Sequence, residues 1–151
     1  MQISNKCFYA LRALFELARL HRDQRPVKIA NIAAAQSIPK RFLEVILNEL
    51  RQGGFVESRR GVDGGYFLAR DPDAISVGEI VCFVDGNLAP VDFASPAGEE
   101  NSSDINHASP YFDFWSMVST RMDEIYNGTS LRKIIEDWER RNADRNLSYD
   151  I

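Results

Sequence analysis

The sequence predicts a mainly α-helical fold with one small β-hairpin wing, in the order of a winged helix-turn-helix followed by a long dimerisation helix. Apolar residues recur every three or four positions in several stretches, as they do in helices that bury one face. Two short runs of aromatic and β-branched residues flank a glycine-rich turn, which is typical of a hairpin. A helix, a helix with a polar outer face and then a hairpin with a basic tip is the chain order of a winged helix-turn-helix.

Length and composition indicate a globular protein. The 151 residues suffice for one domain with an extension or for two small units. Hydrophobic residues make up 44% and charged residues 26%, which excludes a disordered or fibrous chain. No stretch approaches the roughly 20 apolar residues of a membrane-spanning helix, and the N-terminus lacks the layout of a signal peptide. We therefore expect a cytoplasmic protein that does not contact a membrane.

The charges are divided unevenly between the two halves of the chain. Residues 1–71 contain 12 Lys and Arg against 7 Asp and Glu, a net +5. Residues 72–151 contain 6 against 15, a net −9, and the two halves together give the −4 of the whole chain. A basic first half indicates a part that binds a polyanion, and the acidic second half indicates a part with another task.

Three helices are expected in the basic half. The first runs from Ile3 to Leu20, and a short extended stretch at 26–28 separates it from a compact helix at Ile29 to Ala35. The third runs from Pro39 to Gln52, because proline suits a first helical turn and Gly53-Gly54 is a stop signal. One face of this third helix is expected to be core and the other to be free to bind. The core stripe is Leu43, Ile46, Leu47 and Leu50, and the opposite side carries Lys40, Arg41, Glu44, Asn48 and Arg51.

A hairpin and a short capped helix are expected next. The strands of the hairpin are Phe55 to Ser58 and Gly65 to Ala69. Ser76 and Glu79, three residues apart ahead of an apolar run, predict a capping box at the start of a helix. Residues 92–109 lack periodicity and are rich in turn-forming residues, which favours a mobile loop.

A long helix from Ser109 to Tyr126 carries five apolar residues at spacings of 4, 3, 4 and 3, which places them on one seam. They are Tyr111, Trp115, Val118, Met122 and Ile125. We predict that this seam joins two chains, although it could instead pack within one chain. Gly128 ends the helix, and Thr129 or Ser130 caps a last helix that reaches Trp138. The predicted division is a winged helix-turn-helix at 1–86, a flexible loop or effector region at 87–108, dimerisation helices at 109–142 and a disordered tail at 143–151.

Motifs in the basic half agree in order and spacing with one protein family. They are Ile3-Ser4, Lys6, Tyr9-Ala10-Leu11, Ala13-Leu14, Ile29-Ala30, Ile38-Pro39, Phe42-Leu43-Glu44, Ile46-Leu47, Leu50-Arg51, Gly54-Phe55-Val56, Ser58, Arg60-Gly61, Gly64-Gly65-Tyr66, Leu68-Ala69-Arg70, Pro72, Ile75 and Val77-Gly78-Glu79-Ile80. The chain thereby resembles the Rrf-type family of bacterial winged-helix transcription regulators, which includes the iron-sulfur cluster regulator, the nitric-oxide-sensing repressor and the cysteine-metabolism repressor. The resemblance is close over residues 1–86 and weaker through Trp115. It implies a homodimer that binds a near-palindromic operator in double-stranded DNA, with the helix Pro39 to Gln52 in the major groove and the wing Arg59 to Gly65 in the minor groove.

The resemblance places the DNA-binding residues on three elements. They are Lys40, Arg41, Phe42, Glu44, Asn48 and Arg51 in the recognition helix, Arg59, Arg60 and Gly61 in the wing, and Ser4, Lys6 and Tyr9 at the start of the first helix. Arg41 can bind guanine through two hydrogen bonds, and Glu44 can accept one from a cytosine amino group. Arg60 suits a narrow minor groove and Arg59 a phosphate. Tyr9 could equally belong to the core, and the polar residues could simply be solvated.

No cofactor is expected. Cluster-binding relatives carry three closely spaced cysteines in the loop before the long helix, because thiolates hold iron-sulfur clusters. The corresponding residues 91–109 contain no cysteine. Cys7 and Cys82 are expected to be small core residues, and the alternative is an unusual cluster built from them with a partner chain.

Other sensing modes stay open at this point. Asp104 and His107, with Glu99 and Glu100 nearby, have a spacing that could bind a metal, although such a loop is usually just solvated. A small effector near Phe112, Phe114 and Trp115, a protein effector or thiol modification would also suit the sequence, but the aromatic residues favour packing in a core or a dimer.

We therefore predict a dimeric, sequence-specific DNA-binding transcription regulator, with repression as the expected mode. The alternatives are a regulator that senses a metal or an iron-sulfur cluster through atypical ligands, and a protein-interaction adaptor on a winged-helix scaffold. We do not expect an enzyme, because no nucleophile with its base and no paired carboxylates stand out. Gly61 to Gly65 is a hairpin turn and not a phosphate-binding loop, since no helix pattern follows it.

Overall fold

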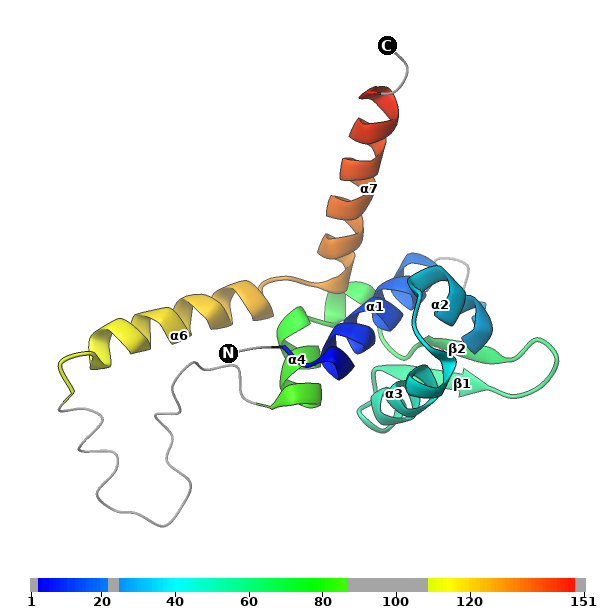
Figure 1. The fold of residues 1–151 in the computed structure, drawn as a ribbon, viewed down its shortest axis with the longest axis horizontal. Coiled ribbons are helices and arrows are strands. Elements are labelled where there is room, and N and C mark those ends of the chain that lie inside the picture. The colour runs from blue at the N-terminus through cyan, green and yellow to red at the C-terminus, as the bar shows by residue number, and fades with distance from the viewer. Residues whose placement is uncertain (1–2, 22–24, 87–108, 149–151) are drawn as a thin grey trace.

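The computed structural model describes residues 3–21, 25–86 and 109–148 (Figure 1). Its elements are α1 (Asn5–Arg19), α2 (Ile29–Gln36), α3 (Lys40–Gln52), β1 (Val56–Arg59), β2 (Gly65–Leu68), the short 3-10 helix η2 (Pro72–Ala74), α4 (Val77–Asp85), α6 (Phe112–Asn127) and α7 (Leu131–Ser148). Helices predominate and the two strands form a single hairpin, as the sequence predicted. None of the described helices is both long and apolar enough to cross a lipid bilayer.

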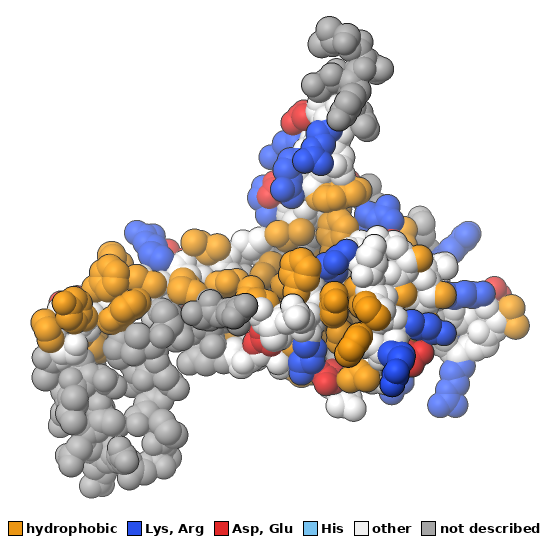
Figure 2. All heavy atoms as spheres, in the orientation of Figure 1, with side chains coloured by type: hydrophobic (Ala, Val, Ile, Leu, Met, Phe, Trp, Pro, Cys, Tyr) orange, Lys and Arg blue, Asp and Glu red, His pale blue; other side chains and the backbone are white. Residues whose placement is uncertain are grey.

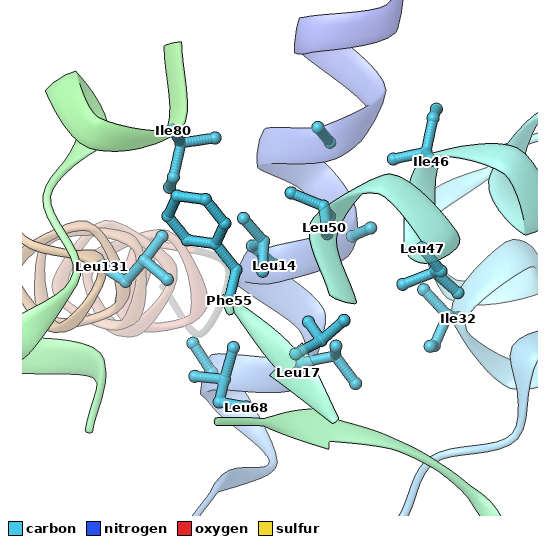
Figure 3. Packing of buried hydrophobic residues seen from close by; sticks show 14 of the residues in the cluster. Leu14, Leu17, Ile32, Ile46, Leu47, Leu50, Phe55, Leu68, Ile80 and Leu131 are labelled. Atoms are coloured by element: carbon cyan, nitrogen blue, oxygen red, sulfur yellow. The ribbon is translucent and has the colours of Figure 1, made fainter. Parts of the chain in front are cut away.

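The hydrophobic core lies around α1. Leu14 from α1, Leu47 from α3 and Ile80 from α4 are completely buried, and Phe55 and Leu131 join them from the start of the hairpin and from α7 (Figure 3). Elements far apart in the sequence therefore share one core. Burial of side chains of this size contributes about 1.5 to 3 kcal/mol each, which makes the core the main source of stability.

Local capping fixes where two of these helices begin. The hydroxyl of Ser4 accepts a hydrogen bond of 3.0 Å from the backbone N–H of Cys7 and so begins α1. The predicted capping box is confirmed at α4, where Ser76 accepts from the Glu79 N–H at 3.0 Å and the Glu79 carboxylate accepts from the Ser76 N–H at 3.1 Å.

The hairpin is antiparallel, with Val56 opposite Leu68 and Arg59 opposite Gly65. The segment expected to be extended before α2 pairs with it, since Val27 and Tyr66 exchange two backbone hydrogen bonds of 2.8 Å. Gly65 makes this contact possible, because a Cβ there would lie 2.5 Å from the Val27 carbonyl oxygen. The wing is thereby fixed to the helical part of the domain.

The two C-terminal helices differ in how they pack. Helix α7 contacts α1, where the rings of Phe15 and Trp138 meet edge to face at 5.5 Å, and its residues Leu131 and Ile135 are buried. Helix α6 extends away from the core beside α4 (Figure 1), and no residue of α6 is buried against the described part of the chain.

The C-terminal region departs from the sequence expectation in one respect. The last helix was expected to end near Trp138, within a dimerisation region at 109–142 and ahead of a disordered tail at 143–151, but α7 continues as a helix to Ser148. Its outer turns carry polar residues on all sides, so their sequence shows no apolar periodicity that would reveal the helix. The predicted cap at Ser130 is present, since its hydroxyl accepts from the Lys133 N–H at 3.2 Å.

Candidate nucleic-acid interface

Helix α3 has one buried apolar face and one exposed face, as predicted. Leu43, Ile46, Leu47 and Leu50 are all buried, with exposures of 4% or less. The opposite face is exposed, and it includes all six of the predicted recognition residues Lys40, Arg41, Phe42, Glu44, Asn48 and Arg51. The turn before α3 is tight because Ser37 adopts a left-handed conformation at φ 50°. The arrangement leaves the long outer face of α3 open to a partner.

The hairpin tip carries the predicted wing residues on its surface. Arg59, Arg60 and Gly61 are all exposed, and Gly61 takes the left-handed φ of +108° that the turn requires. The guanidinium of Arg59 lies over the ring of Phe67, 5.9 Å from its centre, which orients that side chain along the hairpin.

Hydrogen bonds connect the recognition helix to the hairpin. Arg51 Nη1 donates to Ser58 Oγ at 3.3 Å, and the backbone N–H of Phe55 donates to the Leu50 carbonyl at 3.0 Å. The hairpin therefore begins directly from the end of α3. Recognition helix and wing have a fixed relative position, which docking into two neighbouring grooves requires.

The three predicted residues at the start of α1 differ in their availability. Ser4 caps α1 and its hydroxyl donates to Asp85 Oδ1 at 2.5 Å, so it has a structural role. Burial raises the pKa of Asp85, but the hydrogen bonds from Ser4 and the charge of Lys6 lower that pKa by more. Tyr9 is half-buried and packs against the core, as one of the two expectations for this residue had it. Lys6 is exposed, and its ammonium lies 3.1 Å from Glu49 Oε2.

An open hollow lies between the start of α2 and the wing. Its volume is about 640 Å³, and Arg25, Lys28, Asn31 and Arg59 line it together with Asp63. Arg25, Lys28 and Asn31 were not among the predicted site residues. The charges of Arg25 and Lys28 could be counted from the sequence, but only the pairing of Val27 with Tyr66 brings them beside the wing.

Charge and apolar surface are distributed differently over the molecule. On the face shown in Figure 2, Lys and Arg side chains lie around the end of the molecule that carries α3 and the hairpin and also along α7, whereas the surface over α6 is largely hydrophobic. A surface rich in Lys and Arg attracts phosphate groups, and an exposed apolar surface is typical of a contact with another molecule.

The described part of the chain does not bury the predicted seam on α6. Tyr111 is 65% exposed, Trp115 37% and Ile125 67%, while Val118 and Met122 are partly exposed. The alternative that the seam packs within one chain does not hold for the described residues. The ring of Phe114 meets that of Trp115 at 5.0 Å, so the aromatic residues pack on each other and not in a core.

The two cysteines lie in different environments. Cys7 is completely buried as expected, and burial, followed by the charge of Asp85, raises the pKa of its thiol to about 11. The expectation that Cys82 is a core residue was wrong, because it lies on the exposed side of α4 beside Phe83. A short helix of nine residues offers few turns from which to judge its buried face.

Metal binding has little support among the described residues, where no three His, Cys, Asp or Glu side chains are grouped to hold an ion. The loop candidates Glu99, Glu100, Asp104 and His107, and the whole effector region 87–108, lie outside the described residues.

Comparison with known proteins agrees with this geometry. Residues 3–137 match the model of the Rrf2 family, described as an iron-dependent transcriptional regulator. The chain is 32% identical to the HTH-type transcriptional regulator IscR of Yersinia pestis over 137 residues, which are 91% of this chain and 80% of that protein. Among solved structures it is similar to CymR, the global cysteine regulator of B. subtilis, with a TM-score of 0.72 and 29% identity over 90% of this chain and 97% of that one. It is also similar to T. potens IscR, with a TM-score of 0.71 and 29% identity over 93% and 90% of the two chains.

Proposed function

Since the chain belongs to the Rrf2 family and is a DNA-binding transcription regulator, we propose that it acts as a homodimeric repressor that reads a near-palindromic operator through α3 and the wing. The observation that carries this proposal is the exposure of cationic side chains on three parts of the same domain. Arg41 lies on α3, Arg60 on the hairpin tip, and Lys28 at the hollow beside the hairpin.

The exposed face of α3 supplies the groups that distinguish base pairs in the major groove. Arg41, in the first turn, can donate two hydrogen bonds to guanine, a contact worth about 1 to 3 kcal/mol of discrimination. Asn48, two turns further on, can pair in the same way with adenine. Glu44 would be repelled by phosphate, so its favourable partner is the amino group of cytosine.

The wing and the hollow beside it suit the DNA backbone and the minor groove. Arg60, at the exposed tip, can enter a narrow minor groove, where the negative potential is strongest. Arg59, Arg25 and Lys28 would then neutralise the phosphates between the two grooves, and the amide of Asn31 could donate to one of them. Lys6 can exchange Glu49 for a phosphate at little cost, because both partners of that ion pair are exposed.

The exposed seam of α6 supports the homodimer. Two α6 helices packed along Tyr111, Trp115, Val118, Met122 and Ile125 would remove from water a stripe that this chain alone leaves uncovered. A twofold axis through that contact would place two recognition helices about one turn of DNA, roughly 34 Å, apart. A near-palindromic operator matches this symmetry.

The donor set does not fit an iron-sulfur cluster, although the family description includes iron dependence. Clusters require thiolates, and the chain has only two cysteines. One of them, Cys7, is buried with a pKa raised to about 11, so it stays protonated at neutral pH. We therefore assign no step of DNA binding to a cluster. An anaerobic absorbance spectrum of the fresh protein tests the atypical alternative, in which Cys82 and a partner chain supply ligands.

The experiment that tests the proposal begins with genomic fragments recovered with the full chain, followed by titration of the enriched duplex at several salt concentrations. We expect Arg60→Ala to weaken binding and to relax the preference at A·T-rich positions. Lys6→Ala should weaken binding similarly on all sequences. The slope of log K against log salt concentration should also decrease by about one, the value for one lost phosphate contact.

Lys133→Ala is the matched control, because this exposed lysine on α7 pairs with Asp137 and is not part of the proposed interface. If both interface variants bind like the control, the docking arrangement is wrong. If no duplex is enriched or bound by the wild type, the adaptor alternative replaces the proposal.

A further inference from the structure

The exposed face of α3 contains two large apolar side chains among its polar ones. Phe42 is 62% exposed and Val45 is 56% exposed. Both line a hollow of about 370 Å³ between α3 and the start of α1, whose other lining residues are Asn5, Lys6, Tyr9 and Ile46. Single exposed apolar residues are ordinary, but two that share one hollow indicate a surface that is covered when the protein functions.

The hollow is continuous with the surface proposed to read bases. Residues 41, 45 and 48 follow one another at helical spacings of four and three, so Val45 lies on the same strip as Arg41 and Asn48. The buried residues Leu43 and Leu47 occupy the opposite side of the helix. Whatever occupies the space next to Arg41 and Asn48 therefore also meets Val45.

The charges around the hollow favour a polyanion as its occupant. Lys6 lies on its rim, and Lys40 and Arg41 are exposed in the first turn of the same helix. The acidic groups nearby are Glu44, which is exposed, Glu49, which is paired with Lys6, and Asp85, which accepts hydrogen bonds from Ser4. A second copy of this chain has a separate exposed apolar seam on α6 to pack against, so the hollow is not needed for the proposed dimer.

Duplex DNA offers one apolar group in the major groove, the C5 methyl group of thymine. We propose that Val45, with Phe42 beside it, receives a thymine methyl group of the operator, so that Val45 is a specificity-determining residue for a T·A pair in each half-site. Valine can neither donate to nor accept from a base edge. Cytosine carries a hydrogen where thymine carries the methyl group, so a C·G pair would leave this apolar contact unmade. The inference rests on the proposed function.

The experiment replaces the thymines of the operator half-site one at a time with deoxyuridine, which removes only the methyl group. Binding of the wild-type dimer is measured by fluorescence anisotropy. We expect one or two positions at which affinity falls about three- to fivefold, the value for one methyl group removed from water. Changing such a thymine to cytosine should also weaken binding, and 5-methylcytosine in the same place should recover part of the loss.

The Val45→Ala variant assigns the effect to this residue. It should bind the unmodified operator more weakly and no longer distinguish thymine from uracil at the sensitive position. Lys133→Ala is the control, because Lys133 pairs with Asp137 on α7 outside the proposed interface, and the variant should keep the full discrimination.

Two results would overturn the inference and leave the proposed function intact. One is wild-type binding that is equally tight at every uracil-substituted operator, and the other is a Val45→Ala variant that still discriminates as the wild type does. A change in oligomeric state on Val45→Ala would assign the hollow to a protein contact and also overturn it. Absence of binding to any duplex by the wild type would instead overturn the proposed function.

Discussion

Two amphipathic helices of this chain, α3 and α6, each carry an apolar stripe, but only the stripe of α3 is buried among the described residues. The stripe of α3 is completely buried against α1 and its neighbours, whereas no residue of α6 is buried within the described chain. Apolar residues recur at helical spacing in both, although they are more sharply segregated to one face in α3. Periodicity therefore shows which face of a helix has to be covered, but it does not show whether the cover comes from the same chain or from another one.

The physical difference lies in what surrounds each helix. Helix α3 lies between α1, α2 and the hairpin, while α6 contacts α4 and has no buried residue among the described parts of the chain. An isolated helix gains little stability from propensity alone, so a stripe such as that of α6 needs a partner surface. The core of the first half should consequently control folding, and the seam of α6 should control assembly.

The largest expected effect is on folding, and it comes from a substitution in the buried stripe of α3. Leu47→Ala removes a completely buried side chain from α3 and should lower the free energy of unfolding by about 2 to 5 kcal/mol, because the cavity cannot collapse fully. Urea unfolding at one fixed protein concentration measures this. The exposed Gln52→Ala, at the end of the same helix, should stay within about 0.5 kcal/mol of wild type. Equal losses in the two variants would mean that α3 does not bury its stripe.

The second effect is on assembly. Trp115→Glu places a charge in the middle of the seam and should raise the dimer dissociation constant by about 100-fold or more, while helix content is unchanged. Sedimentation equilibrium measures the constant. Thr120→Glu, on the other side of α6, adds the same charge and should leave the dimer intact. A Trp115→Glu dimer as tight as wild type would remove α6 from the interface.

The third prediction compares a thiol inside the core with one outside it. Cys82 is exposed and should react readily with Ellman's reagent, whereas Cys7 is buried and its pKa is raised from 9.0 to about 11, which reduces its thiolate fraction about 100-fold. Native protein should therefore show one fast thiol, and a second only after unfolding. The Cys82→Ser variant should lose the fast phase. A fast thiol that persists in this variant would contradict the burial of Cys7.

The smallest effect concerns the ion pairs between the core and the C-terminal helices. Arg132 at the start of α7 donates to Asp73 at 2.7 Å and to Asp71 at 3.0 Å. A hydrogen bond from the backbone of Asp73, followed by that from Arg132, holds the pKa of Asp71 below its ordinary value of 3.8. A carboxylate with a lowered pKa stabilises the folded state above the unfolded value and loses this contribution as the pH falls through the folded value.

Arg132→Met should therefore melt slightly below wild type at pH 7, and the difference should shrink as the pH decreases below 3.8. Differential scanning fluorimetry across that range measures it, with the exposed Arg145→Met as the control on the same helix. A difference in melting temperature that does not depend on pH would show that the packing of the Arg132 side chain, and not its charge, connects α7 to η2.

Much of the fold could be predicted because its signals are local. The stripe of α3, the capping box of Ser76 and Glu79 and the glycine-rich hairpin each depend on residues within a few positions of one another. The exposed placement of Arg41 and Arg60 follows from the same patterns. Their contacts with DNA remain predictions.

Features that depend on distant contacts could not be predicted. The hollow with Arg25 and Lys28 exists only because Val27 pairs with Tyr66, a contact between segments nearly 40 residues apart. Cys82 is apolar in character, yet it lies on the exposed side of α4. Val45 was not predicted from the sequence, because a single apolar residue on a polar face does not indicate a binding surface. Only the neighbouring residues of α1 show that it lines a hollow.

The central claim is that two copies, joined along α6, present two recognition helices and two wings to one operator. Hydroxyl-radical footprinting of the wild-type protein on its operator tests this most directly. The account predicts two symmetric sets of protected sugars whose centres lie about one helical turn apart, together with a stoichiometry of two chains per duplex. A single continuous footprint from one chain, or two footprints with no fixed spacing, would contradict it.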